Sequence, residues 1–126
     1  DGIVVSNHGG RQVAFGPATI DALPEIAEAV GDRMTVILDS GIRRGADVLR
    51  AKARGADFVL GGRAFAYGVG AGGRAGAERA FEILSLELTR ALGQIGTPCY
   101  RTVDASALAA PPWRRPEGPR LRKSGR

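Results

Sequence analysis

Three short and almost wholly apolar runs alternate with segments of helical periodicity in this sequence. The runs are residues 2–5, 35–38 and 58–60, and they consist mainly of Val, Ile and Leu. Strands that are apolar on both sides, without alternation, are typical of a parallel sheet that is covered on both faces. Repeated strand–helix units of this kind predict either a doubly wound sheet or a (β/α)8 barrel.

The intervening segments predict the helices. Pro17 suits a first helical turn, and the apolar spacing then continues up to Gly31. A second helix is expected over about residues 43–54, with Gly55 as its stop. A short helical piece at 64–67, a Gly-rich turn and a longer helix at about 75–92 should follow. The longer helix has the apolar stripe Ala77, Phe81, Leu84, Leu88 and Ala91.

Charge divides the 126 residues into two parts. Six of the 18 basic residues lie in residues 111–126, against one of the 13 acidic ones, so the net charge of +5 belongs to that segment. We expect 1–110 to be the folded portion and 111–126 a disordered Pro- and Arg-rich tail. Because the positive and negative charges of the folded portion balance and it has no basic face, we do not expect a nucleic-acid partner. Weak contact of the tail with an anionic surface remains open.

We expect neither export nor a membrane-spanning segment for this chain. No apolar run approaches the roughly 18–20 residues of a membrane helix, and the lone Cys99 cannot form an internal disulfide. We expect a cytoplasmic location, with peripheral membrane association of a full-length protein left open. Because the chain opens directly on a strand, without Met, we also expect it to be part of a longer polypeptide.

The most informative segment follows the first strand, where residues 6–12 read Ser-Asn-His-Gly-Gly-Arg-Gln. His8 is the sole histidine, and an imidazole can take up a proton and return it near neutral pH. Arg11 presents a planar fork that matches a carboxylate. Together they are suited to chemistry at a carbon next to a carboxylate. From their spacing alone, an unrelated surface His and Arg explain the segment equally well.

Two Gly- and Arg-containing loops follow the next two strands. Asp39, Ser40, Gly41, Ile42 and Arg43 come after the second strand, and Gly62 and Arg63 after the third. Glycines let backbone N–H groups approach an anion, and guanidinium groups add charge. Barrels often hold a phosphate at the last two strands, beside a short extra helix. Ordinary turns with solvated arginines are the alternative, but two such loops in succession favour phosphate binding.

Residues 68–73 also fit the pattern G-x-G-x-x-G. A dinucleotide-binding fingerprint has to close a strand and open a helix directly. Here about seven residues separate the pattern from the third strand, and no acidic residue ends a further strand downstream. We therefore interpret the segment as a flexible loop and not as a nucleotide site.

The segments at residues 6–12, 39–45 and 61–63, in this order and spacing, resemble the FMN-dependent 2-hydroxy-acid dehydrogenases and oxidases. The similarity extends over about residues 1–108, including Pro-Ala-Thr-Ile-Asp-Ala-Leu-Pro at 17–24. The resemblance implies a (β/α)8 TIM barrel, of which this chain would supply the last three strand–helix units. It also implies oxidation of a 2-hydroxy acid to the 2-keto acid with FMN as cofactor.

The same resemblance implies roles for individual residues. His8 would be the catalytic base, and His8 and Arg11 would bind the substrate. The FMN contacts would come from Ser6, Asp39, Ser40, Gly41, Ile42, Arg43, Gly62 and Arg63. Ser40 stands where many members have Gly, and residues 13–15 depart from the Leu-Asp often found there. The family's flavin-contacting Lys, its substrate-side Tyr residues and the Asp that partners the His lie outside this chain.

Two other interpretations remain open at this point. Another phosphate-binding barrel, of the inosine-monophosphate dehydrogenase type, has a similar Asp-Gly-Gly-Ile-Arg loop but does not need His8 and Arg11. The 126 residues could also be an inactive fragment. For a full-length protein we expect a small 2-hydroxy acid as substrate, a homo-oligomer and no metal.

Overall fold

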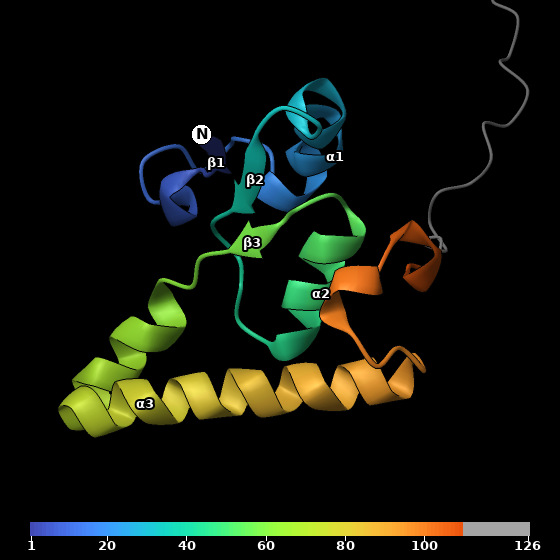
Figure 1. Ribbon diagram of the computed structural model, residues 1–126. Helices are drawn as coiled ribbons and strands as arrows, with labels where there is room; N and C mark the ends of the chain where they lie inside the picture. Colours follow the sequence, from blue (N-terminus) through green and yellow to red (C-terminus); the bar gives the residue numbers. More distant parts are fainter. Residues whose placement is uncertain (110–126) are drawn as a thin grey trace, which may run out of the picture.

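The computed structural model describes residues 1–109, so the predicted tail at 111–126 lies outside the described residues (Figure 1). Three strands and three helices alternate, and short 3₁₀ turns follow the first strand and the last helix. The elements are β1 (Gly2–Val5), η1 (His8–Gly10), α1 (Thr19–Val30), β2 (Thr35–Leu38), α2 (Gly45–Ala53), β3 (Phe58–Val59), α3 (Arg63–Gln94), η2 (Tyr100–Thr102) and η3 (Ala105–Ala107).

The strands form one parallel sheet in the order β1-β2-β3. Val4 is level with Ile37, which is level with Phe58, so these three side chains share one face. Val4 is 48% and Phe58 64% exposed on that face. The prediction of a parallel α/β fold is confirmed. The predicted cover on both faces is found on one face only within residues 1–109.

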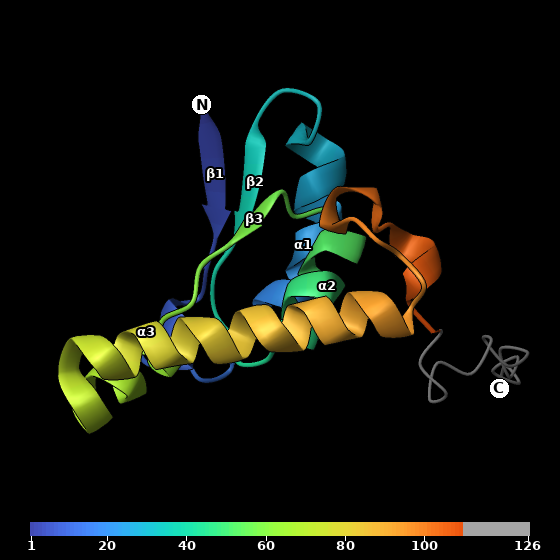
Figure 2. The same ribbon diagram turned by 60° about the horizontal axis from the view of Figure 1, so that its bottom comes forward.

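The covered face of the sheet holds the main core. Val5, Leu23, Val36 and Leu38 are buried there, between the strands and α1. A second cluster joins α2 to α3 and the C-terminal turns through Leu49, Ala53 and Val103. Figure 2 shows the result: α1 and α2 lie behind the sheet, and the carboxyl ends of the strands point toward the first part of α3.

Helix α1 contains a proline, and a neighbouring side chain compensates for it. Pro24 has no N–H to donate to the carbonyl oxygen of Ile20, four residues earlier. Arg54, at the end of α2, donates to that oxygen at 3.3 Å and also lies 3.6 Å from Asp21. The helix begins at Thr19 and not at Pro17, because Ala18 is still extended at ψ 137°.

Helix α2 starts two residues later than predicted. The Asp47 carboxylate accepts hydrogen bonds from the backbone N–H groups of Arg43 and Arg44, at 3.1 and 2.9 Å. These bonds hold Arg43 and Arg44 in front of the helix. A side chain at Gly45 would collide with the backbone of α3 at Leu88, so this glycine allows the two helices to pack closely.

Within residues 64–92, the predicted Gly-rich loop between the two helices was wrong. Helix α3 runs from Arg63 to Gln94 and is broken only at Gly72 and Gly73, whose backbone angles are not helical. The pattern at 68–73 therefore lies mainly in helix, not in a flexible loop. Gly68 and Gly76 bring the two arms of α3 into backbone contact, since a Cβ on Gly76 would overlap the Gly68 carbonyl. The third strand was predicted over residues 58–60, but β3 ends at Val59, so Leu60 lies just past it.

Within residues 1–109, none of the helices combines the length and apolar character that crossing a bilayer requires.

Candidate functional site

The loops that follow the three strands meet at the carboxyl edge of the sheet and border one cavity. This strand-end cavity measures about 360 Å³, and it is lined by His8, Arg11, Asp39, Arg43, Gly62 and Arg63, among others. Three loops that are far apart in sequence thus bring a possible base, a possible carboxylate clamp and two further guanidinium groups together. Ser6 contacts Asp39 but does not line this cavity.

The segment that carries His8 has an unusual backbone. His8, Gly9 and Gly10 all have positive φ angles, of 55°, 69° and 71°. In a residue other than glycine, such as His8, a positive φ is uncommon and costs about 1–3 kcal/mol of conformational strain. It persists only where the surroundings enforce it. Strain of this kind is frequent at functional sites, and here it falls on the residue expected to act as base.

Asp39 connects the first two loops. Its Oδ2 accepts hydrogen bonds from the hydroxyls of Ser6, at 2.5 Å, and Ser40, at 2.9 Å. The Ser6 bond is the largest cause of a lowered pKa of Asp39, followed by the bonds from Ser40 and the nearby His8, while burial acts in the opposite direction. Asp39 is therefore a carboxylate at neutral pH, and it holds both loops.

This lowered pKa predicts acid sensitivity of the site. Because the folded pKa lies below the unfolded one, ionised Asp39 stabilises the fold above its ordinary pKa, and this contribution is lost as pH falls through the folded value. Between about pH 5 and about pH 3, the Tm of the Asp39→Asn variant should fall less than that of the wild type. Asp32→Asn, at an exposed carboxylate beside Arg33, is the control. Equal slopes for wild type and Asp39→Asn would contradict the prediction.

Arg43 and Arg63 flank a second hollow at the start of α3. This arginine cavity of about 330 Å³ is lined by Arg43, Arg63, Ala64 and Tyr67. Within residues 1–109, no side chain caps α3 at Gly62, and neither Arg43 nor Arg11 forms an ion pair. An uncapped helix start beside two guanidinium groups is suited to binding an anion.

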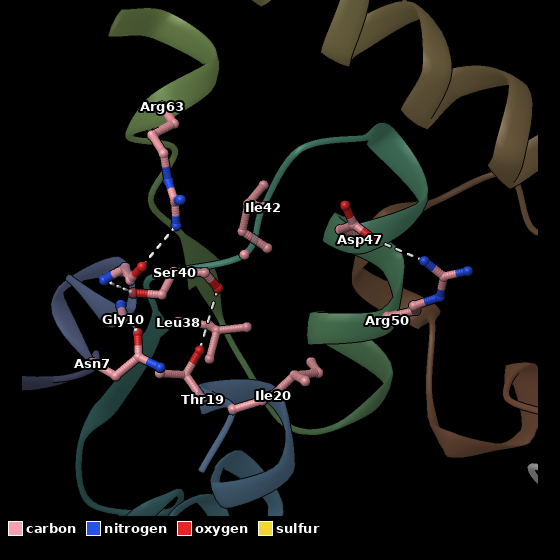
Figure 3. Close-up of a pocket in the computed structure, with 13 residues that line it drawn as sticks. Asn7, Gly10, Thr19, Ile20, Leu38, Ser40, Ile42, Asp47, Arg50 and Arg63 are labelled. Carbon is pink, nitrogen blue, oxygen red and sulfur yellow. Dashed lines mark hydrogen bonds and ion pairs between the residues drawn. The ribbon is translucent and has the colours of Figure 1, made fainter. Parts of the chain in front are cut away.

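Arg63 also reaches the first loop. Its Nη2 donates to the carbonyl oxygen of Gly9 at 2.8 Å (dashed line from Arg63 in Figure 3). A third hollow, the helix-side cavity of about 380 Å³, lies there against Thr19, Ile20 and Leu38. Gly9, Ser40 and Arg63 border both this cavity and the strand-end cavity. They therefore form part of the wall between the two.

Three residues that support the site were not predicted from the sequence. Thr19 is buried, and its hydroxyl donates to the carbonyl oxygens of Asp39, at 2.8 Å, and Ser40, at 3.3 Å. Asn7 accepts a hydrogen bond from Gly10 N–H at 3.1 Å. Tyr67 lines the arginine cavity. Asn before a Gly-rich turn is a recognisable capping signal, but the contacts of Thr19 and Tyr67 depend on tertiary packing.

By its fold and by the placement of its polar residues, the chain is a parallel α/β protein with its cleft at the carboxyl edge of the strands. Its sequence matches the family described as FMN-dependent dehydrogenase over residues 1–110. The chain belongs to this family. Of the two barrel types considered from sequence, the match thus favours the FMN-dependent one over the inosine-monophosphate dehydrogenase type.

Individual relatives agree with this membership. The chain is 51% identical over 96 residues to an FMN-dependent alpha-hydroxy acid dehydrogenase of Penicillium citrinum, covering 76% of this chain and 24% of that protein. It is 50% identical over 108 residues to an L-lactate dehydrogenase of Serratia proteamaculans, covering 86% and 28%. The chain thus spans about a quarter of the length of these relatives.

Solved structures are also similar to this chain. The crystal structure of a soluble mutant of the membrane-associated (S)-mandelate dehydrogenase from Pseudomonas putida has a TM-score of 0.81 to this chain at 37% identity. The match covers 85% of this chain and 30% of that one. A structure of the monotopic membrane protein (S)-mandelate dehydrogenase has a TM-score of 0.83 at 38% identity, with 86% and 29% covered.

Proposed function

We propose that this chain is the C-terminal portion, residues 1–110, of an FMN-dependent enzyme that oxidises a small 2-hydroxy acid to the 2-keto acid. It would supply the last three strand–helix units of a (β/α)8 barrel. The observation that carries the proposal is the strand-end cavity, which is lined by His8, Arg11, Arg43 and Arg63 together. The exposed apolar row of Val4 and Phe58 is consistent with a barrel interior.

The residues fit the phosphate end of FMN. Arg43, Arg63 and the uncapped start of α3 would hold the phosphate, since they combine charge with free N–H groups. Gly41 and Gly62 border open space, where the backbone can approach a ligand closely. Asp39 and Ser40, which line the strand-end cavity, would supply oxygen atoms to the polyol chain. When bound, FMN would supply the acceptor for the substrate's two electrons.

The protein groups would handle the substrate and its protons. Arg11 would bind the carboxylate through both guanidinium N–H directions and so orient the neighbouring hydroxyl-bearing carbon. Converting that carbon to a ketone removes two electrons and two protons: the electrons and one proton would pass to bound FMN, and a base beside the carbon must accept the other proton as the carbonyl forms. His8 lines the same cavity as Arg11 and would accept it at a ring nitrogen.

The proposal predicts that the complete polypeptide carrying this sequence binds FMN and turns over 2-hydroxy acids. Arg43→Ala should weaken FMN binding by about 10-fold or more, because it removes charge-assisted hydrogen bonds to a phosphate. Arg50→Ala is the matched control: Arg50 pairs with Asp47 and lines the helix-side cavity instead. Flavin absorbance and fluorescence titration measure both. A colourless protein without flavin affinity would refute the proposal.

Residues 1–126 alone should bind FMN weakly. Three strand–helix units leave open strand edges and would hold only part of a flavin site. We expect no saturation at micromolar FMN, in contrast to the complete polypeptide. A micromolar or tighter dissociation constant for the 126 residues would show that they form a sufficient site and would overturn the assignment as a partial barrel.

A further inference from the structure

The loop that carries His8 needs to be held, because His8 has a left-handed backbone angle and the two residues after it, Gly9 and Gly10, are glycines with a permissive backbone. Each of their N–H groups donates to a side-chain oxygen. His8 N–H donates to the Ser6 hydroxyl at 3.1 Å, and Gly10 N–H to Asn7 Oδ1 at 3.1 Å. These two partners belong to the same loop and cannot fix its position relative to the next one.

The third N–H group is held from outside the loop. Gly9 N–H donates at 3.0 Å to the hydroxyl of Ser40, which follows β2, 31 residues away in sequence. The bond is partly buried, and Gly9 is the residue directly after His8. It therefore connects the backbone next to the base with the neighbouring loop.

Ser40 is itself in an unfavourable conformation. Its φ is 77°, a value that suits glycine and penalises other side chains. Its hydroxyl has one hydrogen, which is donated to Asp39 Oδ2 at 2.9 Å, so the oxygen lone pairs face the Gly9 N–H. A glycine at this position would relax the backbone but would lose both hydrogen bonds. The hydroxyl thus offsets the strain.

We propose that Ser40 is a positioning residue for His8, acting through the Gly9 N–H and oriented by Asp39. The inference rests on the role given to His8 in the proposed function. Ser40 need not touch the substrate to act in this way. It sets where the loop lies, and small displacements of a catalytic group can be costly for rate.

Two variants of the complete polypeptide separate the hydroxyl from the backbone strain. Ser40→Ala removes the hydroxyl and keeps the strain, whereas Ser40→Gly removes both. In both variants, amide hydrogen exchange of a peptide spanning residues 6–16 should accelerate about 5-fold or more, and kcat at saturating FMN should fall by a similar factor. The Tm of Ser40→Gly should equal or exceed that of the wild type, while that of Ser40→Ala should be lower.

A loss of activity without a loss of stability in Ser40→Gly distinguishes positioning from general support of the fold. Ser106→Ala is the control, since its hydroxyl bonds only locally, to Asp104 just before η3. Wild-type kcat and exchange in Ser40→Gly would overturn the inference, as would a kcat that follows Tm in both variants. If the wild type proves inactive, the proposed function fails, and the exchange data alone decide whether Ser40 holds the loop.

Discussion

Replacing His8 by alanine is expected to lower kcat by about 10²- to 10⁴-fold, the usual contribution of a positioned general base. FMN should remain bound, because the proposed phosphate contacts come from Arg43 and Arg63, on other loops. His8 is the single histidine of the chain, so no other imidazole in it can substitute. Steady-state turnover and flavin content, measured on the same preparation of the complete polypeptide, test this prediction.

Two controls make the His8 result specific. Added imidazole should restore part of the turnover of His8→Ala, because the space left beside Gly9 can admit a free base. Hydrogen exchange of residues 6–16 should remain close to that of the wild type, since the backbone bonds of His8 and Gly9 to Ser6 and Ser40 do not need the ring. Wild-type turnover of His8→Ala would remove the base from the proposed mechanism.

Much of the fold followed from local sequence. The bounds of β1 and β2 were predicted correctly, because a compact run of Val, Ile and Leu between polar residues has few alternatives to a buried strand. The start of α2 was missed because Asp47 holds Arg43 and Arg44 in extended backbone, a side-chain contact that periodicity does not report.

The least predictable element was α3. Glycine disfavours helix, yet five of the nine residues 68–76 are glycine: Gly68, Gly70, Gly72, Gly73 and Gly76. In the structure, Gly68 and Gly76 permit the two arms to touch. Tertiary packing therefore overrode a local preference, and only a three-dimensional structure could reveal the advantage of small residues at these positions.

The sequence predicted which residues border the candidate site better than it predicted the hydrogen bonds that join them. His8, Arg11, Arg43 and Arg63 border one cavity, as expected for groups that follow parallel strands. Their individual roles stay predictions. The hydrogen bonds from Ser40 to Gly9 and from Arg63 to Gly9 were not foreseen, because they join residues 31 and 54 positions apart. Motif spacing within a loop does not determine how two loops meet.

Replacing Arg11 by methionine is expected to reduce kcat/KM for the 2-hydroxy acid by roughly 10²- to 10³-fold. Arg11 follows the His8 loop directly, lines the same cavity, and forms no ion pair within residues 1–109. Its fork is therefore free for a carboxylate. Losing a charged, bidentate partner typically costs about 2–5 kcal/mol in recognition, and the substrate carboxylate would be left without its counter-charge.

Arg11→Lys separates charge from geometry. Lysine keeps the positive charge but cannot present two parallel N–H groups, so an intermediate loss of about 10-fold in kcat/KM is expected. Arg33→Met, at an exposed arginine beside Asp32, is the matched control and should behave as the wild type. FMN affinity should be unchanged in all three variants. If Arg11→Met kept kcat/KM within about twofold of the wild type while binding FMN normally, the carboxylate would have to be held elsewhere, and Arg43 would be the next guanidinium to test.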